Sequence, residues 1–202
     1  MGGSRIRAAL GTLRKNEDGA TIIEFALVAP VFLLMLFGTL EFGHTIYVQA
    51  VLQGAVQNAG RDAGLETGAE NLASINSKVL RQVRNVAPKG AIVTSRRNYQ
   101  SFADVDKPED FTDANGNNIY DPDECFVDLN GNGRWDADRS QGGQGGADDV
   151  VVYTATLEYD RITPFWKLIG WDKKMTLTGT TILRNQPFAD QAVRRETLIC
   201  PS

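Results

Sequence analysis

The fold of this 202-residue chain follows from Gly19-Ala-Thr-Ile-Ile-Glu24-Phe-Ala-Leu-Val-Ala-Pro-Val-Phe-Leu-Leu-Met-Leu-Phe-Gly-Thr-Leu40. Glu24 carries the only charge in this stretch. As a helix, residues 20–40 would extend about 31 Å at ~1.5 Å per residue, which matches the hydrocarbon thickness of a bilayer. We therefore predict a transmembrane segment over residues 20–40.

The residues before this segment predict its orientation. They are polar, and their charged side chains include Arg5, Arg7, Arg14 and Lys15. Positive charges mark the cytoplasmic side of a membrane span. A secretory signal would end in a cleavage site of small residues, which is not found after Leu40. We expect a single-pass protein of the inner (cytoplasmic) membrane, with its N-terminus inside and residues 41–202 in the periplasm or outside.

The apolar pattern continues beyond the predicted span with helical spacing. Small residues accompany it and would let another element approach closely; they are Ala50, Gly54, Ala55, Ala59 and Ala63. We predict one helix from about residue 21 to residue 63. Its first half would lie in lipid, and its second half would pack against an extracytoplasmic domain.

Glu24 is the informative exception in the apolar run. A carboxylate inside a membrane span is costly, so it indicates a function. Its setting is a glycine, Gly19, followed by four residues, then Glu24 and an aromatic residue, Phe25. The alternative is that Glu24 lies at the cytoplasmic interface of an uncleaved anchor.

This spacing resembles the processing motif of the TadE-like family, the minor pilins or pseudopilins of the tight-adherence (type IVb) pilus. Leu40-Glu-Phe-Gly-His44 and Gln57-Asn-Ala-Gly-Arg-Asp-Ala-Gly64 are also similar to the family, and the likeness covers residues 17–67. The resemblance implies that a prepilin peptidase removes a leader, residues 1–19, by cutting between Gly19 and Ala20. It also implies that Glu24 offsets the new amine of a neighbouring subunit. Other pilins, the pilus assembly machine and the membrane are then the expected partners.

The remaining sequence predicts an α+β domain. Helical spacing marks residues 70–86, and β-rich runs cover residues 91–95, 150–159 and 175–183. We expect the long helix to pack on a small antiparallel sheet, as in pilins. Trp166 and Trp171 are expected to pack in the core or in a strand connection. Contact with the membrane surface is the alternative, because lysines flank them.

An acidic insert, residues 104–149, contains 13 of the 25 acidic residues and only 3 of the 21 basic ones. This balance favours cation binding and argues against nucleic acid as a partner. Two segments in it, 15 residues apart, place oxygen donors at positions 1, 3, 5 and 9, with a backbone carbonyl at 7, as in EF-hand calcium loops. The expected ligands are Asp113, Asn115, Asn117, Ile119, Asp121 and Glu124 in the first loop, and Asp128, Asn130, Asn132, Arg134, Asp136 and Asp138 in the second.

Each loop departs from the full pattern at one position. Position 6 of the first loop is Asn118 instead of glycine, and position 12 of the second is Arg139, for which Asp138 is expected to substitute. The loops also resemble dockerin-type and thrombospondin-type repeats. We expect one or two Ca²⁺ ions in a structural role, because Mg²⁺ rarely uses an all-protein cage. The alternative is a solvated, disordered loop, against which Ile119, Tyr120, Leu129 and Trp135 offer side chains to bury.

The two cysteines, Cys125 and Cys200, are expected to form a disulfide in an oxidising compartment. No catalytic constellation is found, so we predict a structural or interaction protein and not an enzyme. The leading hypothesis is a minor pilin or pseudopilin that acts in pilus assembly or surface adhesion. The alternative is an uncleaved, membrane-anchored, calcium-dependent adhesin that enters no filament.

Overall fold

A computed structural model describes residues 18–65, 71–164, 166–187, 191 and 193–201. Most of the predicted leader, residues 1–17, lies outside the described residues. The chain divides into two compact units, one formed by Met1–Thr45 with Arg161–Lys173 and the other by Ile46–Asp160 with Lys174–Ser202. Each unit is described by itself.

The first unit contains the start of helix α2, which runs from Asp18 to Ala63, and the short helix α5, Trp166–Ile169. Large apolar side chains on α2 are exposed from Ile22 to Leu40. Within the described part of the chain, α2 alone is long and apolar enough to cross a membrane. Trp171 is 57% exposed, so it does not pack in a core; it lies in the connection between two strands, where the guanidinium of Arg161 is 5.0 Å from its ring centroid.

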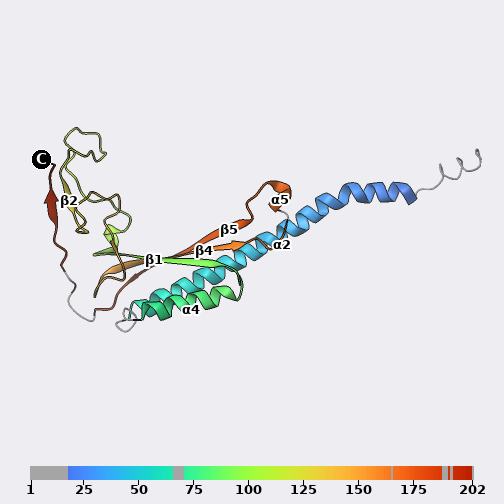
Figure 1. Cartoon of the computed structure of the whole chain (residues 1–202), viewed down its shortest axis with the longest axis horizontal. Coiled ribbons are helices and arrows are strands. Elements are labelled where there is room, and N and C mark those ends of the chain that lie inside the picture. The colour runs from blue at the N-terminus through green and yellow to red at the C-terminus, as the bar shows by residue number, and fades with distance from the viewer. Residues whose placement is uncertain (1–17, 66–70, 165, 188–190, 192, 202) are drawn as a thin grey trace, which may run out of the picture. The chain divides into compact units, whose positions relative to one another are not determined.

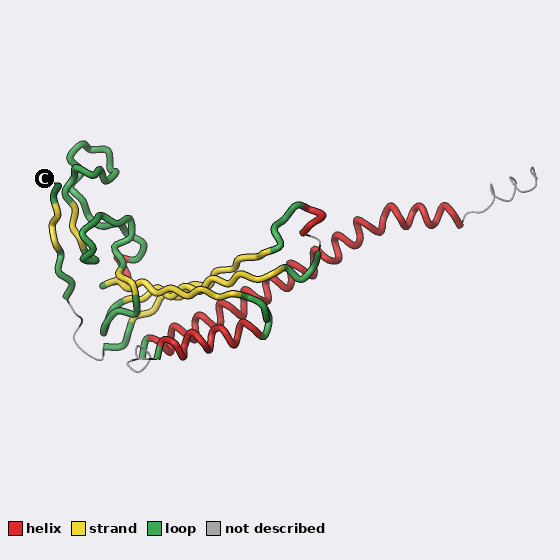
Figure 2. The backbone as a smooth tube through the Cα atoms, viewed as in Figure 1, coloured by secondary structure: helices red, strands yellow, loops and turns green. Residues whose placement is uncertain are grey.

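The second unit is built on a four-stranded antiparallel sheet of order β3-β1-β4-β5. The strands are β1 (Ala91–Tyr99), β3 (Gln141–Gly142), β4 (Val150–Asp160) and β5 (Lys174–Arg184). The end of α2 and helix α4, Leu72–Arg84, lie together along the sheet (Figures 1 and 2). The predicted α+β fold with a long N-terminal helix and an antiparallel sheet is therefore confirmed.

The main core lies between these helices and the alternate residues of β4 that face them. Helix residues three or four apart lie on one face of a helix, and every second residue of a strand lies on one face of a sheet. The core residues of the helices and of β4 follow these two spacings. Its buried residues are Val48, Leu52, Ala55, Val56, Ala59, Ala63, Ile75, Val79, Val83, Ala87, Tyr153, Ala155, Leu157, Tyr159 and Leu177. A smaller cluster of Tyr99, Val150 and Val152 packs with Val105 of the insert. The intervening residues of β4 thus bury a second surface.

Helix α2 also closes the outer edge of the sheet at β5. Gln49 Nε2 donates to the carbonyl of Thr178 at 3.0 Å, and Gln53 Nε2 donates to that of Thr180 at 2.9 Å. An edge strand with free carbonyls is a template for unwanted pairing. The two glutamines occupy these carbonyls and protect β5 from a foreign strand.

Close packing of α2 on β5 depends on Gly60. A Cβ atom there would lie 2.7 Å from Thr181 Cγ2 and 3.2 Å from Leu183 Cδ2, whereas a Cβ at Gly54 meets nothing within 4 Å. Both substitutions by alanine gain about 1 kcal/mol of helix propensity. We expect overpacking to make Gly60→Ala less stable than Gly54→Ala by about 1–3 kcal/mol. Chemical unfolding of the two variants in detergent measures the difference, and equal stabilities would contradict the packing described.

The acidic insert contains little regular structure besides η1 (Phe102–Asp104), β2 (Phe126–Asp128) and β3. Strand β2 pairs with β6, Thr197–Ile199, in a separate two-stranded sheet. Beside it, Cys125 and Cys200 form a disulfide. The C-terminal strand is thereby joined to the insert both by hydrogen bonds and covalently.

Candidate functional site

The first predicted calcium loop curls around the carboxylate of Asp113. Asp113 Oδ1 accepts from the backbone N–H groups of Gly116 at 2.7 Å and Asn117 at 3.2 Å, and Oδ2 accepts from that of Asn118 at 2.8 Å. Gly116 and Asn118 have φ values of 77° and 59°. Asn is one of the few residues besides glycine that tolerate this left-handed conformation, so Asn118 takes the turn that position 6 requires.

The other predicted side chains of this loop converge on Asp121. Asn115 Nδ2 and Asn117 Nδ2 both donate to Asp121 Oδ2, at 2.7 and 2.8 Å. Glu124 closes the loop, because its Oε1 accepts from the N–H of Ala114 at 2.8 Å and its Oε2 from that of Asp121 at 3.1 Å. The structure therefore brings Asn115 and Asn117 together at Asp121, while the carboxylates of Asp113 and Glu124 bind backbone N–H groups of the same loop.

The second loop repeats this geometry. Asp128 Oδ1 accepts from the N–H of Gly131 at 2.6 Å and Oδ2 from that of Gly133 at 2.8 Å, and both glycines have positive φ values, 80° and 74°. Asn130 and Asn132 donate to Asp136 Oδ2 at 2.6 and 2.5 Å. The two loops thus share their turns and their convergent side chains.

Glu109 closes the second loop, a role that the sequence did not assign to it. Its Oε1 accepts from the N–H of Leu129 at 2.8 Å, and its Oε2 accepts from that of Asp136 at 3.1 Å. These are positions 2 and 9 of the loop, the same positions that Glu124 binds in the first loop. Glu109 is fully buried. It lies 19 residues before Asp128, outside the loop, so the spacing of the loop residues does not identify it.

Asp138 does not take the place expected for it. It pairs with Arg97 of β1 and accepts from the N–H of Ser140 at 3.1 Å. Arg139, at the nominal position 12, turns toward the segment that holds Glu109: it donates to the carbonyl of Pro108 and to Asp110 Oδ1, the latter at 2.9 Å. Arg139 thus holds in place the segment from which the buried glutamate reaches the loop.

Aromatic side chains of the insert pack between the two loops. The rings of Tyr120 and Trp135 stack with centroids 4.6 Å apart, and Phe111 and Phe126 meet Tyr120 edge-on at 5.9 and 5.8 Å. Ile119 does not join them and is 66% exposed. The insert therefore has a small aromatic core of its own, which argues against a solvated, disordered loop.

The donor chemistry of both loops suits a hard cation, because every side chain that converges is a carboxylate or a carboxamide. In the structure, the carboxamide N–H groups of the asparagines donate hydrogen bonds to Asp121 and Asp136. In the described residues, no group of three or more His, Cys, Asp or Glu side chains is arranged to hold a metal. Any cation site here consequently needs asparagine and backbone oxygens as well as carboxylates.

Hydrogen bonds hold two carboxyl groups of the insert in their charged form. The backbone N–H of Asn118, followed by those of its neighbours, lowers the pKa of Asp113. Burial opposes ionisation of Asp138, but hydrogen bonds and the charge of Arg97 outweigh it and lower the pKa of this group as well. Both aspartates thus favour the folded insert only while they are ionised.

The insert is therefore expected to lose stability in acid. A lowered pKa in the folded state contributes stability above the unfolded value of about 3.9, and this contribution is lost as the pH falls through the folded value. The emission of Trp135 should stay constant from neutral pH down to about 5 and change below about 4. A profile that changes between pH 7 and 5 would contradict this assignment, and Asp138→Asn should reduce the acid-dependent part.

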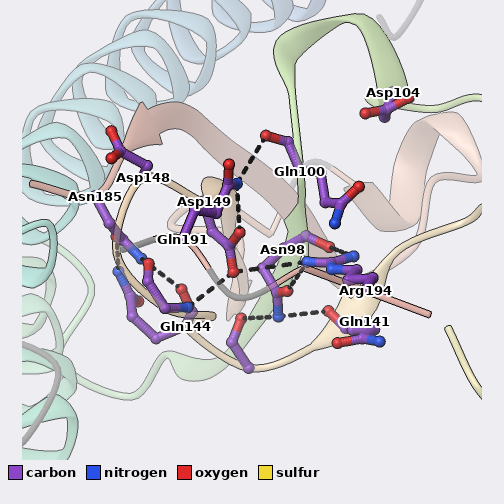
Figure 3. A network of polar contacts seen from close by, with 12 residues as sticks. Asn98, Gln100, Asp104, Gln141, Gln144, Asp148, Asp149, Asn185, Gln191 and Arg194 are labelled. Atoms are coloured by element: carbon purple, nitrogen blue, oxygen red, sulfur yellow. Dashed lines mark hydrogen bonds and ion pairs between the residues drawn. The ribbon is translucent and has the colours of Figure 1, made fainter. Parts of the chain in front are cut away.

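A buried polar network joins the exit of the insert, β1 and the C-terminal segment (Figure 3). Asp149 accepts from Gln191 Nε2 at 2.9 Å and from the N–H of Gly146 at 2.8 Å, and its Oδ2 lies 3.7 Å from Arg194 Nη2. Arg194 also donates to Asn98 Oδ1. This network fixes where the insert and the C-terminal segment leave the sheet.

Two further members, Asn185 and Gln144, link the network to α2 through the carbonyl of Ala63. Asn185 donates to the carbonyls of Gln144 at 2.9 Å and Gly146 at 2.7 Å, and Gln144 Nε2 donates to the carbonyl of Ala63 at 3.1 Å. These hydrogen bonds connect the exit of the insert, the end of β5 and the end of α2. The local sequence around Gln144 and Asn185 gave no signal of this role.

The predicted processing residues lie at the start of α2. Gly19, Glu24 and Phe25 are exposed on this helix, and Ala20 belongs to it. Glu24 is thus accessible to a partner along the same helical surface as the apolar side chains.

The comparisons with known proteins bear on this same region. The model of the family described as TadE-like protein matches residues 19–61. The resemblance predicted from the motif is therefore confirmed over this part of the chain, which coincides with α2. No curated protein and no solved structure matches the chain.

Proposed function

Because residues 19–61 match the TadE-like family, we propose that this chain is a minor pilin or pseudopilin of a tight-adherence pilus. The family associates it with that pilus system. The observation that carries the proposal is the coincidence of the matched region with an exposed apolar helix that starts at the processing motif.

In this proposal, the prepilin peptidase cuts between Gly19 and Ala20, and α2 then anchors the mature chain in the inner membrane. Glycine before the cut offers an unhindered backbone. The new amine of Ala20 is positively charged, and Glu24 of a neighbouring subunit would offset it where the low dielectric strengthens attraction. The domain that follows α2 then lies outside the cytoplasm, where the Cys125–Cys200 disulfide is stable.

The insert is proposed to bind Ca²⁺ in one or both loops. Asp113, Asn115, Asn117, Asp121 and the carbonyl of Ile119 would hold an ion in the first, with Glu124 closing the site. In the second loop, the carbonyl of Arg134 and the buried carboxylate of Glu109 complete the set formed by Asp128, Asn130, Asn132 and Asp136. The ion would add stability to a segment that has only a small aromatic core. Calcium here is structural and supplies no catalysis.

The assembly role is tested by Glu24→Ala, with Glu17→Ala as a matched control in the predicted leader. Cells that lack the native gene are complemented with each variant, and tight-adherence pili and membrane complexes are measured. We expect Glu24→Ala to be processed but to lose its co-purification with pilins, because the amine of Ala20 then has no counter-charge. Glu17→Ala should behave as the native chain. Normal assembly of Glu24→Ala would refute this role for the carboxylate.

A further inference from the structure

The segment Arg161–Lys173 connects β4 to β5 and belongs to the same compact unit as the first part of α2. It is attached to the helix at Glu41, which is buried. Thr163 donates to Glu41 Oε2 from its backbone N–H at 3.2 Å and from its hydroxyl at 2.9 Å, and Arg161 Nη1 lies 3.6 Å from Glu41 Oε1. These contacts hold the segment beside α2 (Figure 1).

The attachment fixes the level of the segment along the helix. Glu41 follows Leu40, the last residue of the predicted span, by one residue, or about 1.5 Å of helix. If residues 20–40 lie in the hydrocarbon, Arg161 and Thr163 are therefore held at the boundary between lipid and water. The ion pair with Arg161 also neutralises the carboxylate of Glu41 at a depth where a free charge would be costly.

The segment exposes apolar and aromatic surface at this level. Trp171 is 57% exposed, Ile162 54% and Ile169 41%. The guanidinium of Arg161 lies 5.0 Å from the centroid of the Trp171 ring, so the residue that attaches the segment also fixes this ring. Lys167 is exposed, and its amine lies 5.3 Å from the ring of Trp166.

We propose that the segment Arg161–Lys173 rests on the phospholipid surface, with Trp171 and Ile169 among the headgroups and Lys167 on lipid phosphates. Tryptophan is enriched at membrane interfaces because one part of its ring system is apolar and another donates a hydrogen bond. Lysine beside it complements the phosphate charge, and Asp172 is the one acidic residue of the segment. The exposed apolar surface of α2 leads directly to this site, which makes a bilayer the occupant that fits it.

This inference rests on the membrane placement of α2 in the proposed function. Its consequence is a second contact with the bilayer, in addition to the span. A single helix can rotate and tilt, whereas a helix with an attached interfacial segment has a fixed orientation relative to the surface.

Depth-dependent fluorescence quenching tests the contact. The native chain is reconstituted in vesicles of phosphatidylglycerol and phosphatidylethanolamine, with or without bromine on the acyl chains near the headgroup, and vesicle flotation checks insertion. We expect bromine near the headgroups to remove up to about one third of the emission through Trp171, the share of one tryptophan among three. Trp171→Phe, at an exposed position, should abolish the part of the loss that comes from Trp171.

Two results would overturn the inference in distinguishable ways. A chain that floats with the vesicles but shows no bromine-dependent loss retains the anchor and refutes the interfacial contact. A chain that does not float refutes both the contact and the membrane placement on which it rests.

The attachment itself is tested by Glu41→Gln, which keeps the size of the side chain and removes the ion pair with Arg161. We expect the bromine-dependent loss to fall to about half or less of its native value, as the segment is released from the helix. Asp62→Asn is the control, because it removes an exposed ion pair with Lys78, 3.0 Å long, at the other end of α2. Equal quenching in native chain and Glu41→Gln would show that Glu41 does not position the segment.

Discussion

Replacement of Asp149 by asparagine is expected to lower the free energy of unfolding by about 3–5 kcal/mol, the cost of removing one partner of a buried ion pair. The side chains of Asp149 and Arg194 are each 11% exposed. Asparagine would leave Arg194 without this counter-charge. It would also place a carboxamide N–H against one of two donors, Gln191 Nε2 or the N–H of Gly146.

Asp62→Asn serves as the matched control for this substitution. Its partner Lys78 lies 3.0 Å away, but both side chains are about half exposed, and such surface pairs contribute only ~0–1 kcal/mol. Unfolding in denaturant, followed by tryptophan emission in detergent, compares the two variants. A loss below about 1 kcal/mol for Asp149→Asn would mean that the network does not hold the insert and the C-terminal segment to the sheet.

Glutamine at Glu109 or Glu124 is expected to weaken Ca²⁺ binding at least roughly tenfold, since loss of supporting groups alone reduces metal affinity by that order. Each substitution keeps the size of the side chain but replaces one carboxylate oxygen by an N–H group. That group would face the backbone N–H donors at positions 2 and 9 of its loop. The two variants should affect different loops, so the double variant should bind least.

Asp138→Asn distinguishes the geometry from the simple sequence pattern. Asp138 was expected to substitute at position 12, but it pairs with Arg97, so its replacement should leave Ca²⁺ affinity nearly unchanged. Titration calorimetry of the native chain and the four variants, with circular dichroism as a check on folding, measures this. If Asp138→Asn binds Ca²⁺ more weakly than Glu109→Gln does, the assignment of Glu109 is contradicted. If the native chain binds no Ca²⁺, the calcium proposal is refuted.

The long helix and the main strands could be predicted from the sequence because local patterns determine them. Apolar residues at helical spacing marked α2, and the alternation in residues 150–159 marked β4. The short strands β2, β3 and β6 contain two or three residues each. Their pairing depends on contacts between distant segments and on the disulfide, so no local pattern identifies them.

In the candidate site, too, the residues close together in the sequence could be predicted, and the residue brought in from a distance could not. The first loop is contiguous, and its spacing identified residues whose side chains hydrogen-bond within that loop in the structure. The second loop takes its closing carboxylate from Glu109, and only the fold brings that residue there. Trp171 was expected to pack in the core or in a strand connection, with the membrane surface as the alternative. It lies in the connection between β4 and β5 and is 57% exposed, and which of these positions it takes is decided by the fold and not by the local sequence.

The central claim is that this chain is processed as a pilin, and the mass of its mature form tests this most directly. The full chain is expressed in membranes with and without a prepilin peptidase, and intact mass and N-terminal sequence are determined. We predict a chain that begins at Ala20 only when the peptidase is present, and no cleavage when Gly19 is replaced by valine. A native chain that retains residues 1–19 in the presence of an active peptidase would contradict processing as a pilin. The N-terminal helix would then be a permanent membrane anchor.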